Sequence, residues 1–198
     1  MSIDGHADVP AGKIAAIITS LEMFARPPQR PEFGDAWRLQ RADKPDLAWF
    51  RDLYRLVGEN WLWFTRHRMP DAALAAIIHH PAIEVYALES ADGDEGLIEL
   101  DFRQTGECEL SFFGVAPKLV GGGAGRWLMN RAIALAWSRP IRRFWVHTCT
   151  FDHPKALGVY QRAGFAVYDR RRVSFEDPRE RGILPRTLTH PLLPQLDG

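Results

Sequence analysis

The feature that most constrains this chain is a glycine-rich segment between a strand-like run and a helix-like run. Four glycines fall within residues 121–125, after the apolar-rich residues 108–115 and before residues 126–137. Glycine has no side chain, so backbone amides can approach a bulky group there. The start of a helix adds unpaired N–H donors and the positive end of the helix dipole. The segment therefore predicts an anion site, with phosphates as the expected ligand.

The composition is that of a single globular domain over residues 1–198. Hydrophobic residues make up 46% of the chain and charged residues 25%, which is enough for a core without disulfide support. The 25 basic and 25 acidic residues balance, so the charge predicts neither a nucleic-acid partner nor a membrane-surface partner. Cys108 and Cys149 are the two cysteines, which favours a reducing compartment.

The N-terminus shows no basic segment followed by an apolar one, and no apolar run approaches the length of a membrane span. These features predict a cytoplasmic protein.

The first part of the chain predicts two strands and two helices. The first helix is expected to be capped by Asp43 or Asp46, and the second by Asp71, because Asp accepts hydrogen bonds from orphan amides at helix starts. Gly58 and Pro81 mark their ends. The expected strands are residues 16–26 and 36–41, and the expected helices are residues 47–57 and 72–79.

The second part predicts mainly strands. Short turns separate three successive strands, so these strands should be antiparallel neighbours. The expected strands are residues 83–88, 97–103, 108–115, 144–151 and 165–175, with a last one near 184–188; the expected helices are residues 126–137 and 154–162, the second with Pro154 in its first turn. The fold class is therefore α/β (α+β), with a mixed, mostly antiparallel central sheet flanked by helices.

Two motifs then resemble the GNAT superfamily of Gcn5-related N-acetyltransferases. The family signature Gln/Arg-x-x-Gly-x-Gly/Ala falls on residues 120–125, where Gly123 and Gly125 match and Val120 departs. A second signature, Asn-x-x-Ala-x-x-x-Tyr-x-x-x-Gly-Phe, falls on residues 153–165. Its matching residues are Ala156, Tyr160, Gly164 and Phe165, and His153 replaces the usual Asn. Competing glycine motifs fit worse: a Walker loop needs Lys-Ser/Thr where this chain has Arg126-Trp127.

The resemblance implies an enzyme that moves the acetyl group of acetyl-CoA to a primary amine by direct attack in a ternary complex. It implies a GNAT fold with its core at about residues 36–176, so the N-terminal strand is an extra one that extends the sheet or supports a homodimer. It also implies the acceptor, a small-molecule or peptide amine. The residues it places at acetyl-CoA are Phe113, Gly114, Val115, Gly121, Gly122, Gly123, Ala124, Gly125, Arg126, His153, Ala156 and Tyr160.

By the same resemblance, Glu109 is the candidate base and Tyr160 the candidate acid for the departing thiolate. Glu109 could equally be a solvated strand residue like Glu107, and Tyr160 could simply pack on the sheet. His147 is a packed strand histidine or a second proton carrier, since its ordinary pKa is near 6.5. The spacing of His147, Cys149 and His153 fits no zinc pattern, so no metal is expected.

Two rival functions stay open at this point. One is a non-catalytic acyl-CoA-binding module, which the departures at Val120 and His153 keep in play. The other is an acyltransferase that acts on a protein N-terminus or uses a longer acyl-CoA.

Overall fold

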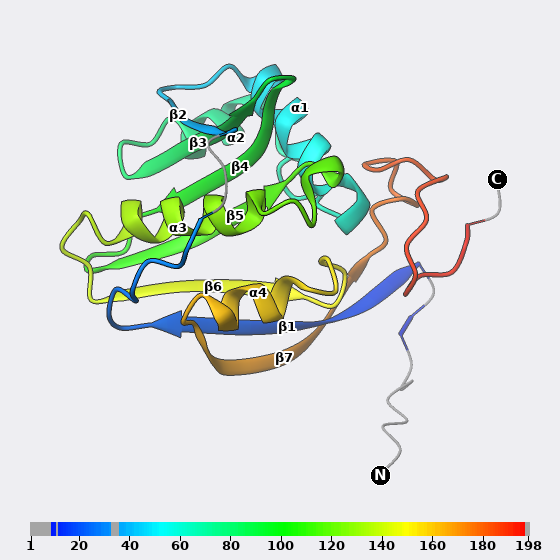
Figure 1. Cartoon of the computed structure of the whole chain (residues 1–198). Helices are drawn as coiled ribbons and strands as arrows, with labels where there is room; N and C mark the ends of the chain where they lie inside the picture. The colour runs from blue at the N-terminus through cyan, green and yellow to red at the C-terminus, as the bar shows by residue number, and fades with distance from the viewer. Residues whose placement is uncertain (1–8, 11, 33–35, 197–198) are drawn as a thin grey trace, which may run out of the picture.

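The computed structural model describes residues 9–10, 12–32 and 36–196. These residues build one seven-stranded sheet with the strand order β2-β3-β4-β5-β6-β1-β7 and with helices on both faces (Figure 1). Neighbouring strands are antiparallel except β5 and β6, which are parallel. The mixed, mostly antiparallel sheet predicted from the sequence is confirmed.

The elements have the expected order, and most boundaries lie within three residues of the predicted ones. The clearest shift is at β4, which begins at Gly93 rather than at Leu97, because the turn that precedes it is tighter than the composition indicated. The strands are β1 Lys13–Met23, β2 Arg38–Ala42, β3 Ile83–Ser90, β4 Gly93–Asp101, β5 Glu107–Val115, β6 Arg143–Cys149 and β7 Ala166–Glu176. The helices are α1 Leu47–Gly58, α2 Asp71–Ile78, α3 Ala124–Ala136 and α4 Ala156–Arg162, with the short turns η1 Glu59–Trp61 and η2 Pro117–Leu119.

Three helix starts test the residues that the sequence predicts there. Asp46 caps α1, and its carboxylate accepts from the amides of Ala48 and Trp49. Asp71 was wrongly predicted as a cap: it lies inside the first turn of α2, and its carboxylate accepts from Arg51 instead. Pro154 precedes α4, which begins only at Ala156.

The N-terminal strand is an interior strand of the sheet. β1 pairs antiparallel with β6 on one side and with β7 on the other, so it separates two strands that a crossover helix connects. Leu21, near its C-terminal end, is fully buried, and burying a leucine side chain contributes about 1.5–3 kcal/mol. The extra strand thus enters the middle of the second half of the sheet rather than adding an edge.

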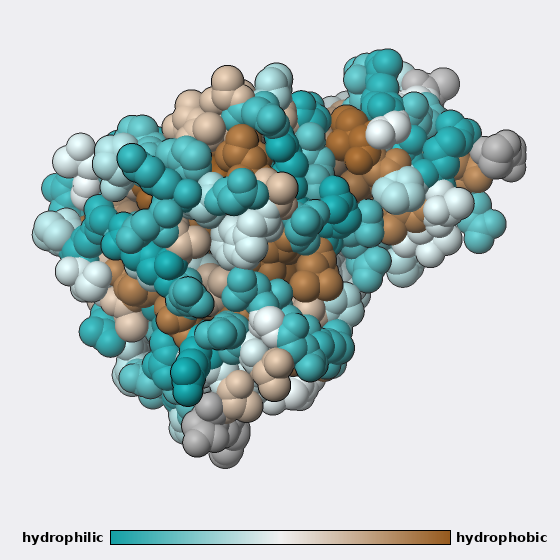
Figure 2. Space-filling view, turned by 90° about the horizontal axis from the view of Figure 1, so that it is seen from above, coloured by the Kyte–Doolittle hydropathy of each residue, from teal (hydrophilic) through white to brown (hydrophobic). Residues whose placement is uncertain are grey.

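Each face of the sheet has its own apolar core. Leu128, Met129 and Ala132 of α3 and Tyr160 of α4 pack on one face, which we call the α3–α4 face. Phe50, Leu53 and Val57 of α1 and Leu74 and Ile78 of α2 pack on the other, the α1–α2 face. Seen from above, the surface is mainly hydrophilic, with apolar side chains in small separate patches (Figure 2).

The segment after β7 folds into turns, so the strand predicted near 184–188 is wrong. Pro185 lies within it, and the amides of Leu184 and Leu188 donate to the carbonyls of Pro178 and Pro185. The segment is anchored by Arg179, which is 1% exposed. The Arg179 guanidinium donates to the Asp177 carboxylate and to two tail carbonyls, those of Leu188 and Pro194. We call residues 177–194 the C-terminal tail.

Candidate active site

The parallel strands β5 and β6 separate in the middle of the sheet. Their pairing is confined to Glu107–Glu109 against Arg143–Trp145, while β5 continues to Val115 and β6 to Cys149. Although β5 is the fourth of seven strands, residues 111–115 are all partly exposed. A sheet interior would normally bury such residues, so this half of β5 faces an opening.

A bulge in β5 coincides with this separation. Glu99 of β4 lies opposite Phe112 and Leu100 lies opposite Leu110, so Ser111 is an extra residue in β5. A bulge bends its strand and increases its twist, and bulges are frequent next to active sites. The bend directs the end of β5 away from β6 and toward the glycine segment.

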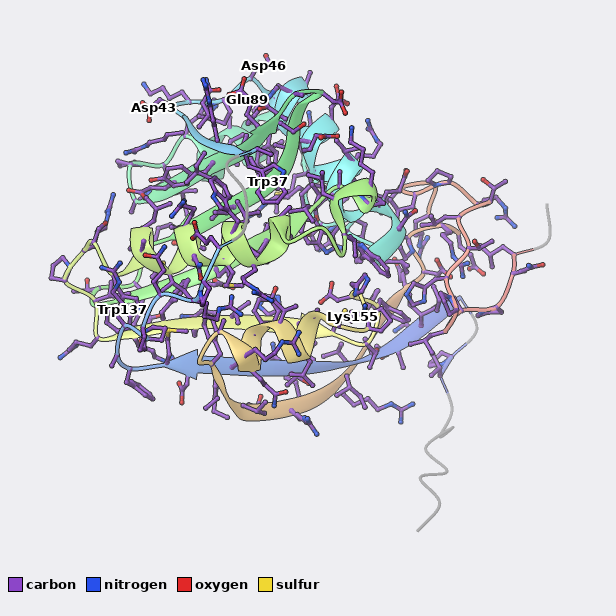
Figure 3. The ribbon with its side chains drawn as sticks, in the orientation of Figure 1. Trp37, Asp43, Asp46, Glu89, Trp137 and Lys155 are labelled. Carbon is purple, nitrogen blue, oxygen red and sulfur yellow. The ribbon has the colours of Figure 1, made fainter. Side chains whose placement is uncertain are left out.

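The glycine loop after β5 has the backbone geometry that the sequence predicts for an anion site. Gly121 and Gly123 have φ values of 90° and 96°, and Gly123 is the residue before α3. A side chain at Gly121 or Gly125 would meet nothing within 4 Å. Trp37 lies beside the loop, 3.8 Å from the position of a Gly123 Cβ (Figure 3).

Only some of the loop amides are available to a ligand. The Gly122 amide donates to the Leu119 carbonyl, and the amides of Arg126 and Trp127 donate to the Gly123 carbonyl. Those of Ala124 and Gly125, at the start of α3, make none of these bonds, as expected for the first residues of a helix. The amides of Gly122, Arg126 and Trp127 are therefore engaged within the protein, whereas those of Ala124 and Gly125 can bind a ligand.

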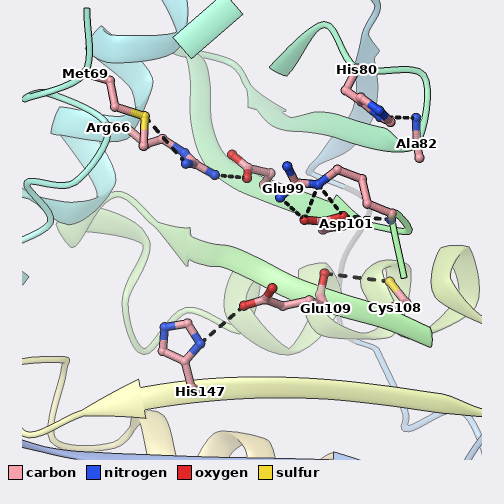
Figure 4. Close-up of polar contacts among 10 residues, drawn as sticks. Arg66, Met69, His80, Ala82, Glu99, Asp101, Cys108, Glu109 and His147 are labelled. Atoms are coloured by element: carbon pink, nitrogen blue, oxygen red, sulfur yellow. Dashed lines mark hydrogen bonds and ion pairs between the residues drawn. The ribbon is translucent and has the colours of Figure 1, made fainter. Parts of the chain in front are cut away.

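Glu109 and His147 lie together where the two strands part. The Nδ1 atom of His147 is 3.4 Å from the Glu109 carboxylate (Figure 4). The Glu109 side chain is 22% exposed and that of His147 is 47% exposed, so both are accessible to a small molecule or a water. The structure thus joins the candidate base to the residue considered as a second proton carrier.

The neighbouring acids on β4 are neutralised by arginines. Asp101, which lies opposite Glu109, forms a bidentate pair with Arg103. Glu99 is fully buried and pairs with Arg66 (Figure 4). The Arg66 guanidinium also lies over the Phe112 ring. Burial raises the pKa of Glu99, and Arg66 opposes this rise. No sequence pattern predicts this pair, because its members are far apart in the chain and on different elements.

Tyr160 lies close to the open end of β5. Its ring centroid is 6.2 Å from that of Phe113, and the residue is 7% exposed. Burial raises the pKa of the Tyr160 hydroxyl, and the charge of Asp152 raises it further. Ala156, one turn earlier, packs against the same core. The structure therefore brings the second motif next to the strand that leads into the glycine loop.

Two aromatic side chains from the segment after α1 connect the separated strands. The Trp63 ring packs on Phe112 of β5, and its Nε1 donates to Asp152 beyond β6 at 3.3 Å. Trp61 packs edge-on against His153, whose Nδ1 accepts from the Lys155 amide. Lys155 lies at the start of α4 (Figure 3). The sequence indicated an aromatic connector here but not the Asp152 contact that fixes it.

An arginine from the connector between β1 and β2 also approaches the α3–α4 face. Asn130 of α3 donates to the Arg30 carbonyl at 2.9 Å. Within the described part of the chain, the buried Nε and Nη2 atoms of Arg30 have no hydrogen-bond partner. Burial lowers the pKa of Arg30, and the charges of Arg126 and Arg162 lower it further. Three cations thus gather between α3 and α4.

Cys149 and the nearby histidines are potential metal ligands by residue type. No group of three or more potential ligands assembles among the residues that the structure describes. Burial, reinforced by Asp152, raises the pKa of Cys149 to about 12, so its thiol stays neutral. Likewise, no described helix combines the length and the apolar character needed to cross a membrane.

His67, which follows Arg66, is expected to make the fold sensitive to acid. Burial, with the charges of Arg55 and Arg51, lowers its pKa to about 4. The folded state therefore resists protonation of His67. The stability that the neutral His67 side chain contributes above pH 6.5 is lost as the pH falls toward 4. Between these pH values, the melting temperature should fall less in His67→Gln than in the wild type. His80→Gln, at an exposed histidine, is the control; an equal fall in all three proteins would contradict this assignment.

A profile of the acetyltransferase (GNAT) family matches residues 49–165, which is more than half of the chain. The chain belongs to the GNAT acetyltransferase family. The matched region runs from α1 to just beyond α4, and it includes the glycine loop, Glu109 and Tyr160. Arg30, β1 and the C-terminal tail lie outside it.

Solved structures share the GNAT fold. A GCN5-related N-acetyltransferase from Sphaerobacter thermophilus is 15% identical with a TM-score of 0.58, over 82% of this chain and 53% of that one. An aminoglycoside acetyltransferase from an uncultured soil metagenomic sample, in complex with trehalose, is 17% identical with a TM-score of 0.54, over 65% of this chain and 88% of that one. The IAA acetyltransferase from Bacillus cereus is 17% identical with a TM-score of 0.51, over 71% of this chain and 99% of that one.

These likenesses concern the fold, since all the identities are low. This chain spans about half the length of the Sphaerobacter protein. No curated protein matches the sequence.

Proposed function

We propose that this GNAT acetyltransferase transfers the acetyl group of acetyl-CoA to a primary amine by direct attack in a ternary complex. The observation that supports this most is the separation of β5 from β6 beyond Glu109, which leaves residues 111–115 partly exposed beside the glycine loop. The free amides at the start of α3 suit a pyrophosphate. The backbone of Phe113, Gly114 and Val115 suits the pantetheine arm and the thioester.

The amine must lose a proton before it can attack. An alkyl amine has a pKa near 10, so it is protonated at neutral pH and needs a general base. Glu109 is the proposed base, and His147, 3.4 Å away, is the second carrier for the proton. Backbone N–H groups of β5 that have no partner on β6 would polarise the thioester carbonyl.

Tyr160 is the proposed acid for the CoA thiolate. Because burial raises its pKa, the hydroxyl keeps its proton at neutral pH and can donate a hydrogen bond to the departing sulfur. His153 and Ala156 are proposed to border the pantetheine arm. The cytoplasmic location, the single-domain organisation and a homodimer stay predictions from the sequence.

The reaction itself is tested by thiol release from acetyl-CoA with a panel of primary amines. We expect release that depends on the amine. Tight acetyl-CoA binding without turnover, unchanged in Glu109→Gln, would instead support a non-catalytic module. Competition among acyl-CoAs of increasing chain length would separate an acetyltransferase from an enzyme with a longer donor.

Arg30 is expected to strengthen coenzyme A binding. A phosphate beside Arg30 would accept from its Nε and Nη2 atoms and offset the repulsion from Arg126 and Arg162, and a hydrogen bond between charged groups contributes about 1.5–3 kcal/mol. Arg30→Gln should therefore raise the Kd for CoA about tenfold or more in calorimetric titrations.

Two comparisons complete this test. Arg38→Gln, at an exposed residue of β2, should bind CoA like the wild type. Repeating the titration with 3′-dephospho-CoA shows which phosphate is involved: the effect of Arg30→Gln disappears if Arg30 contacts the 3′-phosphate and persists if it contacts the pyrophosphate. Equal CoA affinity of Arg30→Gln and the wild type would refute the contact.

A further inference from the structure

One side chain spans the separation between β5 and β6. Trp63 lies in the segment after α1, and its ring centroid is 5.1 Å from that of Phe112 of β5. Its indole Nε1 donates at 3.3 Å to the carboxylate of Asp152, which follows β6. Beyond Glu109 the two strands no longer pair with each other. Trp63 and Asp152 therefore connect them where the sheet does not, and we call this pair of residues the brace.

The Trp63 ring has little freedom to move. A Cβ atom on Gly58, at the end of α1, would lie 2.2 Å from the ring, and one on Gly114 of β5 would lie 3.6 Å from it. The Tyr54 ring also packs against it, with 5.3 Å between the centroids. The indole thus fills space that the two glycines leave open, and a side chain at Gly58 would displace it.

The Asp152 carboxylate accepts hydrogen bonds on both of its oxygens. Oδ1 accepts from Trp63, and Oδ2 accepts from the Thr148 hydroxyl at 2.6 Å and from the Cys149 amide at 2.8 Å. An asparagine has the same shape, but it presents one acceptor oxygen and one NH₂ group that only donates. A carboxylate can therefore satisfy the donors on both sides, whereas an asparagine at this position cannot.

The loop that carries Asp152 is itself held by the C-terminal tail. The Phe151 carbonyl accepts from Nε2 of the buried His190 at 3.1 Å. Phe151 also packs in one cluster with Leu62, the residue before Trp63. Both ends of the brace are thus fixed before a substrate binds.

We propose that the brace fixes the distance between β5 and β6, and that Asp152 is thereby a positioning residue for the acetyl transfer. The inference rests on the proposed function, in which the thioester lies against the backbone of residues 113–115. The proposed acid Tyr160 lies beside Phe113. Without the brace, the strands can move apart, so the thioester, the amine and Tyr160 no longer meet at the reacting distance. A displacement of about 1 Å can lower a rate on the order of 100-fold.

The brace and the glycine loop act on different faces of the sheet. Trp63 and Phe112 pack on the α1–α2 face. α3, which the glycine loop opens, packs on the other face. Loss of the brace should therefore lower kcat and leave the binding of the CoA phosphates largely intact.

Asp152→Asn tests the brace without changing the shape of the side chain. The new NH₂ group faces either the Trp63 indole or the Cys149 amide, so one of these donors loses its acceptor. We expect kcat for thiol release to fall about tenfold, and the Kd for CoA in calorimetric titrations to change less than about threefold. Tyr160 should keep its proton in this variant, because burial is the larger cause of its raised pKa.

Trp63→Phe completes a double-mutant cycle. Phenylalanine keeps an aromatic ring against Phe112 but donates no hydrogen bond, so kcat should again fall about tenfold. In the Trp63→Phe background the new amide no longer faces an indole N–H, so Asp152→Asn should lower kcat no further. Independent effects would multiply to about 100-fold in the double variant. That result, or a wild-type kcat in Asp152→Asn, would overturn the inference.

Trp49 and Asp94 provide the matched control. The Trp49 indole Nε1 donates to the Asp94 carboxylate at 2.9 Å, and Trp49 also packs on the α1–α2 face. This pair, however, joins α1 to β4 rather than β5 to β6. Trp49→Phe and Asp94→Asn should therefore keep the kcat of the wild type. A fall as large as that in Asp152→Asn would assign the loss to packing of this face and refute the brace.

Hydrogen exchange separates this inference from the proposed reaction, since it needs no turnover. Exchange of the amides of residues 111–115 is measured by mass spectrometry. It should be about tenfold faster in Asp152→Asn than in Asp94→Asn and the wild type, because the end of β5 is less restrained. If no amine supports thiol release, the proposed reaction fails while this comparison still decides the brace. Equal exchange in Asp152→Asn and the wild type would refute it.

Discussion

Glu109→Gln is expected to lower kcat by about 10²–10³-fold at neutral pH, with little change in acetyl-CoA affinity. Glutamine has the shape of glutamate but cannot accept the proton of an ammonium group. The glycine loop lies at the other end of β5, so binding of the CoA phosphates should not depend on this side chain. Steady-state kinetics with a saturating amine, together with calorimetry for acetyl-CoA, measures both effects.

The pH dependence makes this test specific. Without a base, the variant depends on the fraction of amine that is already deprotonated, so its kcat/KM should rise about tenfold per pH unit up to the pKa of the amine, near 10. Glu107→Gln is the control, because Glu107 lies on the same strand and pairs with Arg143. Loss of activity in Glu107→Gln equal to that in Glu109→Gln would assign both effects to the strand rather than to a base.

Arg66→Ala is expected to destabilise the fold by about 3–5 kcal/mol. Its partner Glu99 is fully buried in the α1–α2 face of the sheet, and a buried carboxylate without its cation is strongly unfavourable. Burial already raises the pKa of Glu99, and removing Arg66 removes the charge that opposes the rise. The free energy of unfolding, measured with urea at pH 7, gives the size of the effect.

The sign of the pH dependence follows from the raised pKa of Glu99. A carboxyl whose pKa is higher in the folded state contributes stability below its unfolded pKa, and this contribution is lost as the pH rises through the folded pKa. The deficit of Arg66→Ala should therefore shrink at acidic pH. The double variant Arg66→Met/Glu99→Leu should recover most of the loss at pH 7.

An exposed pair provides the comparison. Arg41→Ala removes a partner of Asp43 at the surface and should cost no more than about 1 kcal/mol. A loss in Arg66→Ala as small as that in Arg41→Ala would mean that Glu99 reaches water or another cation when Arg66 is absent.

Much of the architecture was predictable because its signals are local. The turns between the strands at 83–115, the glycines before α3 and the spacing of Ala156, Tyr160 and Gly164 each act through neighbouring residues. The sequence predictions were wrong where a distant residue or a nearby proline competes with the structure that the local pattern favours. Asp71 has the chemistry of a helix cap, but the Arg51 guanidinium engages it, and the β-forming residues near 184–188 are turned by Pro185 and the contacts around Arg179.

The sequence by itself determined the order of the elements, the glycine loop and the identity of the motif residues, because these depend on hydrogen-bonding capacity and spacing along the chain. Tertiary structure alone decided which distant residues meet. It placed β1 between β6 and β7, paired Arg66 with Glu99, set His147 beside Glu109 and closed a cavity between α1 and the C-terminal tail. Such contacts depend on how the sheet twists and where β5 bends away from β6, which no local pattern encodes.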